Sequence, residues 1–201
     1  MIVLVLAAVG VAAWSISRNL HHTATPAPPS THSPSHSAAA AVPLRPVSAA
    51  VYNPLGSSGD DDPTDAPNAI DGSASTYWHT SYYLSHQFGN LKKGTGLILD
   101  MGRPVRLSQV AVQFGASCCA HVVIEVGNSN TVSTATLSTF TPVRSSSAAH
   151  GSTTFDVTSK VTGRYVLIWI TDLPPLAGNP GKYETMIYNV TVHGFAAGQP
   201  S

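Results

Sequence analysis

Short apolar segments with a period of two dominate residues 48–195. Val110, Val112 and Phe114 share one face of such a segment, and residues 122–126 repeat the alternation. Because successive side chains of a strand point to opposite faces, this pattern predicts β-strands with one buried face. No long amphipathic helical pattern follows the amino-terminal region, so the sequence predicts an all-β fold.

Two runs, residues 96–99 and 165–170, are apolar without interruption. Such runs are expected of central strands that are buried on both faces. The further candidate strands are residues 49–52, 136–140, 153–157 and 187–193. Turn signals rich in Gly, Pro and Asn separate these segments, and about eight short strands of this kind predict a β-sandwich or jelly roll.

The amino end is apolar from Ile2 to Trp14, and a helix that extends to Ile16 contains no charge. A helix of this length spans roughly 22 Å, less than the ~30 Å hydrocarbon core. A cleaved signal peptide is one interpretation, with Val11-Ala12-Ala13 before the cut, but no Lys or Arg precedes the apolar stretch. We therefore favour a transmembrane anchor over residues 1–17 whose cytoplasmic flank is missing.

Residues 18–47 are rich in Pro, Ser, Thr, Ala and His, and include His21, His22, His32 and His36. This composition cannot bury enough apolar surface to offset its ordering entropy, so we expect a disordered linker that acts as an extended stalk. The histidines are expected to be a solvated spacer rather than a metal site. Residues 196–201 are predicted to form a disordered tail.

The stretch 69–80 combines an Asp71-Gly72 turn, the hydroxyl of Thr76 and the large side chain of Trp78. Gly tolerates positive φ, and Asp bonds its own backbone, so the pair predicts a tight turn. The pattern Ala-x-Asp-Gly followed by Thr-x-Trp resembles the discoidin, or coagulation factor V/VIII type C, family of galactose-binding-like domains.

The rest of the folded part extends this resemblance. In order, the chain carries Tyr52-Asn53-Pro54, Gly59-Asp60-Asp61-Asp62, Thr76-Tyr77-Trp78-His79-Thr80, the segment 88–104, Arg164-Tyr165-Val166-Leu167-Ile168-Trp169 and Val190-Thr191-Val192-His193-Gly194. This set is similar to the discoidin-like domain at the extracytoplasmic carboxyl end of some actinobacterial MviN/MurJ-type flippase homologues and transmembrane Ser/Thr kinases. The resemblance implies a membrane-tethered, extracytoplasmic β-sandwich, residues 48–195, without catalytic activity.

Calcium is the one cofactor that the resemblance implies, as a structural ion between the Asp-Gly turn and a carboxyl-terminal Glu. Asp71 and Thr76 match the turn, and Asn189 stands where the family has Glu. A neutral oxygen in place of a carboxylate lowers calcium affinity. The alternative is that Asp71 only closes the turn and Asn189 bonds the backbone.

Four acidic residues, Asp60, Asp61, Asp62 and Asp65, crowd one loop. A second cation site is one interpretation, and a solvated acidic loop is the one we favour.

Tyr77, His79, Tyr82 and Tyr83 follow the turn. Aromatic rings stack on the apolar faces of sugars, and polar neighbours bond sugar hydroxyls, so these residues are candidate ligand-binding residues. The alternative is that one or two of these tyrosines pack against Trp78 and the loop covers the core. Trp78 and Trp169 are expected to be core residues.

The two cysteines, Cys118 and Cys119, are adjacent. A disulfide between neighbours is possible, but we favour one side chain turned inward as a small apolar group and the other near the surface. His121 is the one candidate for a further metal ligand nearby.

Charge and catalytic motifs exclude several classes of function. Lys plus Arg and Asp plus Glu are each 10, and charged residues are only 10% of the chain, so no basic footprint for nucleic acid is present. The two glutamates, Glu125 and Glu184, lie in unrelated segments, whereas a glycosidase needs two carboxylates facing one bond. We do not expect an enzyme.

We therefore expect a non-catalytic binding module on a stalk, held at the cell membrane by a single span with its folded domain extracytoplasmic. The expected partner is cell-envelope glycan, that is, a cell-wall polysaccharide or peptidoglycan. The alternative is an interaction or sensory domain that acts with an envelope protein, a kinase or flippase partner, or a missing upstream region. Exposed aromatics at loop tips favour the first, and a broad apolar patch on a sheet face favours the second.

Overall fold

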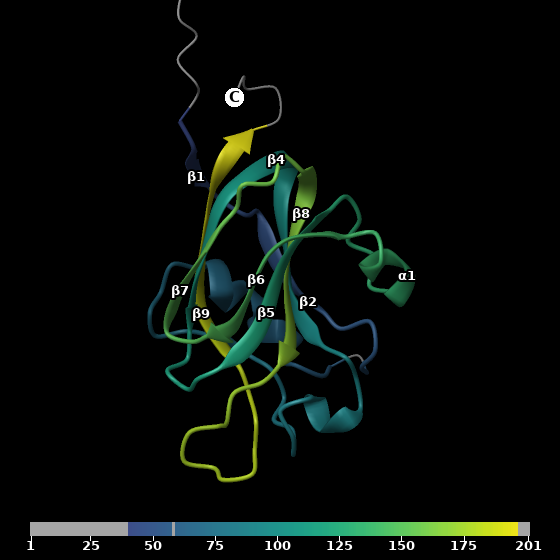
Figure 1. The fold of residues 1–201 in the computed structure, drawn as a ribbon, viewed down its shortest axis with the longest axis vertical. Helices are drawn as coiled ribbons and strands as arrows, with labels where there is room; N and C mark the ends of the chain where they lie inside the picture. The colour runs from purple at the N-terminus through teal and green to yellow at the C-terminus, as the bar shows by residue number, and fades with distance from the viewer. Residues whose placement is uncertain (1–39, 58, 197–201) are drawn as a thin grey trace, which may run out of the picture. The chain divides into compact units, whose positions relative to one another are not determined.

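The computed structural model describes residues 40–57 and 59–196, and this part of the chain is an all-β sandwich, as predicted (Figure 1). Its strands are β1 (Val42–Leu44), β2 (Ser48–Tyr52), β3 (Trp78–His79), β4 (Thr95–Phe114), β5 (Ala120–Gly127), β6 (Thr141–Ala149), β7 (Ser152–Asp156), β8 (Thr162–Asp172) and β9 (Met186–Ala196). Three short helices accompany them: η1 (Pro63–Ile70), η2 (Phe88–Asn90) and α1 (Thr134–Leu137).

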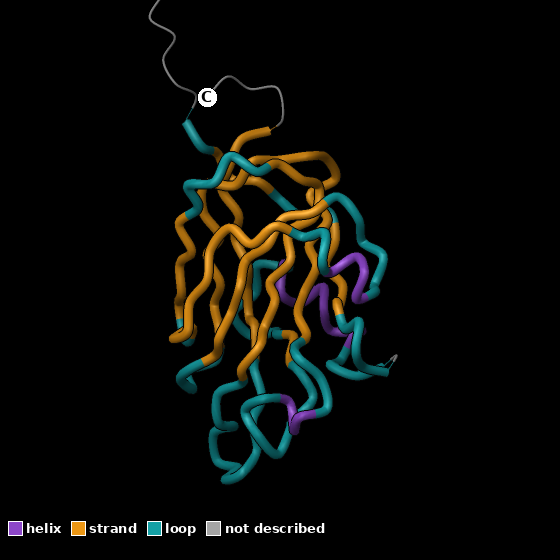
Figure 2. Tube along the Cα trace, turned by 45° about the vertical axis from the view of Figure 1, so that its right-hand side comes forward, coloured by secondary structure: helices purple, strands orange, loops and turns teal. Residues whose placement is uncertain are grey.

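The long strand β4 belongs to both layers of the sandwich. Its first part pairs with β2 and β8, and its second part pairs with β7 and β9. The register against β8 shifts between Asp100 and Val105, where β4 passes from one layer to the other. One layer is therefore β2-β4-β8-β5-β6, and the other contains β1, β3, β9, β4 and β7 (Figure 2).

The main core lies between the two layers. Val110, Val112 and Phe114 are buried and Gln113 is exposed, which confirms the predicted alternation. Their partners across the core come from the run in β8, where Val166, Ile168 and Ile170 are fully buried, and from β4, β5 and β9. Burial of this apolar surface supplies the main stabilising free energy of the domain.

A second apolar cluster covers the outer face of the β2-β4-β8-β5 layer. It contains Tyr52, Ile98, Phe140, Tyr165, Leu167 and Trp169. The α1 segment closes it, and the Tyr52 hydroxyl donates to the Ser133 carbonyl at 3.0 Å. The runs predicted to be buried on both faces are confirmed by this cluster.

Residues 136–140 do not form the predicted strand. Ser133 caps α1 by accepting a hydrogen bond from the Thr136 N–H at 3.0 Å, and the chain then turns into Phe140. A side-chain cap of this kind stabilises the first turn of a helix. These local hydrogen bonds favour a helical turn and outweigh the β-propensity of the Thr-rich segment.

Glu125 lies on the same outer face and is only 8% exposed, although the alternation of β5 predicted a solvent-facing position. Burial raises the pKa of its carboxyl group to about 7. In the ladders, Glu125 lies opposite Pro142 of β6 and Leu167 of β8.

The folded part begins earlier than predicted. Strand β1 lies inside the predicted linker and pairs with β9, with Val42 opposite Gly194. The boundary at residue 48 is therefore wrong, and β9 continues to Ala196. The anchor predicted for residues 1–17, the linker before residue 40 and the tail after Ala196 lie outside the described residues. Among the residues that are described, no helix is long and apolar enough to cross a membrane.

The described residues, 40–57 and 59–196, belong to one compact unit. Both apolar clusters lie within this unit. A unit with its own core is expected to fold without the preceding residues.

A buried ion pair connects the loops at one end of the sandwich. The Asp61 carboxylate and the Lys92 ammonium are in contact, and their side chains are 0% and 3% exposed. The same carboxylate accepts hydrogen bonds from the Thr95 hydroxyl at 2.8 Å and the Tyr83 hydroxyl at 3.2 Å. The Asp61 carbonyl accepts from the Trp78 indole N–H at 2.7 Å. Asp61 is therefore neither part of a solvated loop nor a free cation ligand, and both interpretations of this residue were wrong.

Asp61→Asn should destabilise the domain by about 3–5 kcal/mol, because Lys92 then stays buried without a counter-charge. Urea denaturation of the 37–201 fragment measures this loss. Asp65→Asn, in the same acidic segment but without a buried partner, should change stability by no more than about 0.5 kcal/mol. Equal stabilities of the two variants would contradict a structural role of the Asp61–Lys92 pair.

Candidate functional site

Several loops gather at the end of the sandwich that includes the loop between β8 and β9 (Figures 1 and 2). The segment around Tyr83 lies beside the loop between β8 and β9, where the Tyr83 N–H donates to the Tyr183 carbonyl at 2.9 Å. The Thr80 N–H likewise donates to the Thr185 carbonyl at 3.0 Å. The residues predicted from the first segment are thus placed against residues about one hundred positions later.

Tyr77, His79 and Tyr188 form an aromatic strip. The ring centroid of Tyr77 lies 5.2 Å from that of Tyr188 and 5.8 Å from that of His79. Tyr77 is 36% exposed, so its ring remains accessible to a ligand. Tyr188 was not predicted from the sequence, because its position beside Tyr77 depends on the pairing of β3 with β9.

His79 lies between two carboxylates. Its Nε2 is 3.4 Å from Asp62 Oδ2, and its Nδ1 is 3.4 Å from Glu184 Oε1. Burial raises the pKa of the Glu184 carboxyl group, and the nearby His79 opposes that shift. The group of three offers both donors and acceptors to hydroxyl groups of a ligand.

Tyr82 is a second exposed aromatic residue, at 54% exposure. The Lys182 ammonium lies 3.9 Å from its ring centroid, in a cation–π contact that connects the two loops. Tyr82 is therefore accessible to a ligand, and its role as a ligand-binding residue stays a prediction.

Tyr83 is not placed to bind a ligand. It is only 9% exposed, its ring packs against Phe88 at 5.2 Å, and its hydroxyl donates to Asp61. Burial and the charge of Asp61 raise the pKa of this phenol. Of the four predicted residues, this one is a core residue, because consecutive side chains in the extended segment point in opposite directions.

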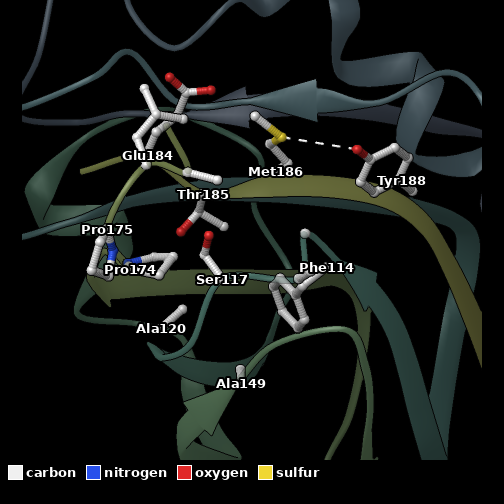
Figure 3. Close-up of a pocket in the computed structure, with 14 residues that line it drawn as sticks. Phe114, Ser117, Ala120, Ala149, Pro174, Pro175, Glu184, Thr185, Met186 and Tyr188 are labelled. Atoms are coloured by element: carbon white, nitrogen blue, oxygen red, sulfur yellow. Dashed lines mark hydrogen bonds between the residues drawn. The ribbon is translucent and has the colours of Figure 1, made fainter. Parts of the chain in front are cut away.

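A hollow of about 220 Å³ lies beside the aromatic strip (Figure 3). We call it the β9 hollow, and its walls include Phe114, Ser117, Pro174, Thr185, Met186 and Tyr188. The Tyr188 hydroxyl points toward the Met186 sulfur at 4.0 Å, and the Glu184 carboxyl group points away from the hollow, on the side of His79.

One polar atom in the β9 hollow lacks a partner. Thr185 is 2% exposed, and its Oγ1 has no hydrogen-bond partner within the part of the chain that the structure describes. In Figure 3 the side chains of Thr185 and Ser117 point into the hollow toward one another. An unpaired buried hydroxyl costs free energy that a ligand hydroxyl or a bound water recovers.

Two of the three predicted calcium residues, Asp71 and Asn189, line a different hollow, and Thr76 bonds Asp71. Asp71 closes its own turn: its Oδ1 accepts from the Ser73 N–H at 2.7 Å and its Oδ2 from the Thr76 hydroxyl at 2.7 Å. The hydrogen bond from Thr76 is the main cause that lowers the pKa of Asp71, and the bond from Ser73 lowers it further. Gly72 has φ of 79°, as the turn requires.

Asp71 and Asn189 line the same hollow of about 420 Å³, together with the cationic Arg45. Asp71 is the only carboxylate among the residues that line it. The donor set therefore fits calcium only in part, since calcium takes six to eight oxygens and protein sites commonly supply several carboxylates.

We favoured an interpretation in which one cysteine side chain is turned inward, but neither cysteine is buried. Cys118 and Cys119 are joined in a disulfide, with Cys118 exposed and Cys119 half-buried. His150, rather than His121, is the imidazole grouped with them. His121 instead bonds the Thr171 hydroxyl at 2.9 Å.

Comparison with known proteins assigns the family. The model of the F5/F8 type C family described as the NedA-like, galactose-binding domain matches residues 68–168. The chain belongs to this family. The match contains Asp71, Tyr77, His79 and Tyr82, whereas Glu184 and Tyr188 follow it.

Several solved structures are similar to this chain. The CBM32 of AlyQ in complex with 4,5-unsaturated mannuronic acid is 20% identical, with a TM-score of 0.50, over 75% of this chain and 97% of that one. Truncated AlyQ with CBM32 and alginate lyase domains is 20% identical, with a TM-score of 0.53, over 81% of this chain and 35% of that one. The chitosan-binding module 1 of a chitosanase/glucanase from Paenibacillus sp. IK-5 is 19% identical, with a TM-score of 0.49, over 75% and 96% of the two chains. At these identities the likeness to the two AlyQ structures concerns the fold alone.

Calcium binding at Asp71 stays a prediction. Millimolar calcium should raise the melting temperature of the 37–201 fragment by a few degrees, through mass action on a weak site. Asp71→Ala should remove this shift, Asn189→Glu should enlarge it by adding a carboxylate, and Asp65→Ala should leave it unchanged. Identical melting of the unaltered fragment in calcium and in chelator would exclude the site.

Proposed function

We propose that this galactose-binding-like domain is a non-catalytic module that binds glycan of the cell envelope. The observation that carries the proposal is the aromatic strip beside the β9 hollow, in which Tyr77 is exposed and His79 and Tyr188 are half-buried. Tyrosine rings supply a flat apolar surface for the C–H faces of a sugar ring, and the edges of the strip supply hydrogen bonds.

The size and polarity of the site support a single sugar unit as the group bound. The β9 hollow, about 220 Å³, is smaller than the ~300–1,000 Å³ pockets that take drug-sized ligands. The unpartnered hydroxyl of Thr185 lies inside it, and Asp62, His79 and Glu184 lie beside it. Envelope polysaccharides and peptidoglycan repeat such units many times, so weak single sites are strengthened by multivalency.

A binding role also fits the positions of the two glutamates. Burial raises the pKa of the Tyr52 phenol on the outer face of the sheet, and the charge of Glu125 on that face adds to the rise. Glu184 instead lies beside His79 at the loop end. Two carboxylates on opposite sides of one bond are the requirement for glycoside hydrolysis, and these two do not meet it.

Binding of the 37–201 fragment to purified cell wall, or to a defined glycan, tests the proposal. Tyr77→Ala and Tyr82→Ala should each weaken binding at least about fivefold, or by about 1 kcal/mol, through loss of stacking. Sedimentation of the fragment with the insoluble glycan measures this, and the melting temperature should not change.

Val132→Ala is the matched control, because Val132 is 49% exposed in the loop before α1. It should bind as the unaltered fragment does. Failure of the fragment to bind any wall fraction or glycan, with specific capture of an envelope protein, would favour an interaction domain that acts with a kinase, flippase or other partner.

The exposed leucines are where such a protein contact would form. Leu84 and Leu91 are 76% and 79% exposed and lie in the loops near Tyr83. They are separate side chains in loops and not a broad apolar face of a sheet, which is why we place the glycan function first.

We further propose that the domain is held outside the cytoplasm by an anchor in residues 1–17. The apolar run from Ile2 to Trp14 and the Pro-rich segment after it support this arrangement. Protease added to intact spheroplasts should cut within residues 18–40 and release the folded domain. Protection of this segment until the membrane is lysed would show the opposite orientation.

A further inference from the structure

Three side chains with soft or borderline metal-ligand atoms converge next to the β9 hollow. Cys118 and Cys119 belong to the loop between β4 and β5, and His150 belongs to the turn between β6 and β7. One ligand atom from each lies within 4.8 Å of the other two. Cys118 and His150 are exposed and Cys119 is half-buried, so a metal ion in solution can reach the group.

Backbone hydrogen bonds hold the two loops together without help from the sulfur atoms. The Phe114 N–H donates to the Gly151 carbonyl at 2.7 Å, and the Gly151 N–H donates to the Gly115 carbonyl at 2.8 Å. Ala120 pairs with Ala149 in the β5–β6 ladder, directly after the cysteines and directly before His150. The three ligands are therefore kept close whether the sulfur atoms are joined or free.

The imidazole of His150 is also oriented. Its Nδ1 lies 2.9 Å from the Ala148 carbonyl oxygen. A carbonyl only accepts, so Nδ1 carries the proton and Nε2 keeps its lone pair. A ring N–H bonded to a backbone carbonyl is the usual outer support of a histidine that binds a metal through its other nitrogen.

We propose that reduction of the Cys118–Cys119 disulfide opens a zinc site made by the two thiolates and His150 Nε2. The disulfide takes up two electrons and two protons and becomes two thiols. With a phosphine as the reductant, the phosphine is oxidised to its oxide and water supplies the oxygen and the protons. Zn²⁺ then displaces the two thiol protons, and the fourth position of its tetrahedron is free for water.

Zinc fits this donor set better than calcium or magnesium does. Thiolate sulfur and imidazole nitrogen are its preferred ligands, whereas the hard cations require oxygen. Oxidation consumes the same two sulfur atoms, so the disulfide and the zinc complex exclude one another. The site therefore responds to redox conditions independently of the proposed glycan function.

The test uses the 37–201 fragment, which omits His21, His22, His32 and His36. The fragment reduced by phosphine should retain one zinc ion per chain after gel filtration, and the oxidised fragment should retain none. Cobalt in place of zinc should give thiolate-to-metal charge-transfer absorption in the reduced fragment only. Absence of bound metal from the reduced fragment would overturn the proposal.

Three variants separate the ligands from their surroundings. Cys118→Ser with Cys119→Ser should abolish zinc retention, and His150→Ala should weaken zinc binding at least about tenfold. His121→Ala, an imidazole of the same region held by Thr171, should bind zinc as the unaltered fragment does. Equal zinc affinity of the His150→Ala and unaltered fragments, with unchanged melting temperatures, would remove His150 from the site and overturn the proposal.

Discussion

The buried pair of Asp61 and Lys92 is the interaction on which the loop end of the sandwich depends. Two charges that are removed from water are tolerated only where further hydrogen bonds satisfy their remaining donors and acceptors. The Asp61 carboxylate accepts such bonds from the hydroxyls of Thr95 and Tyr83 and from the Ser81 N–H. The residues held inside alternate with those presented outside. Asp61 precedes Asp62, Trp78 lies between Tyr77 and His79, and Tyr83 follows Tyr82. A polar network within the domain thus positions an aromatic surface on it.

Much of the fold could be predicted from the sequence, because strand periodicity is a local property that long apolar segments repeat. Residues 110–114 and 165–170 were predicted correctly for this reason. Strand β1 was missed because three residues without alternation leave no periodic signal, and its place depends on β9. Residues 136–140 were assigned wrongly because the Ser133 cap, a single hydrogen-bond pattern, outweighs propensity there.

Only the part of the site that lies in one continuous stretch of sequence could be predicted. Tyr77, His79 and Tyr82 follow a recognisable turn, but which of two adjacent tyrosines faces inward depends on packing against Phe88. Glu184, Thr185 and Tyr188 join them through the pairing of β3 with β9, a contact between distant segments that local patterns do not encode. The same applies to His150, which reaches the cysteines through the register of β5 and β6.

Strand β1 pairs with the carboxyl-terminal part of β9, and this pairing decides at which end of the domain a further segment is attached. The chain enters this domain and leaves it at neighbouring points, since Val42 and Gly194 are opposite one another. In Figure 1 this end of the sandwich lies far from the loop between β8 and β9. Any segment joined at either side is therefore attached at the end remote from the aromatic strip. A tether at either side therefore leaves the loop between β8 and β9 at the end of the domain opposite the attachment point.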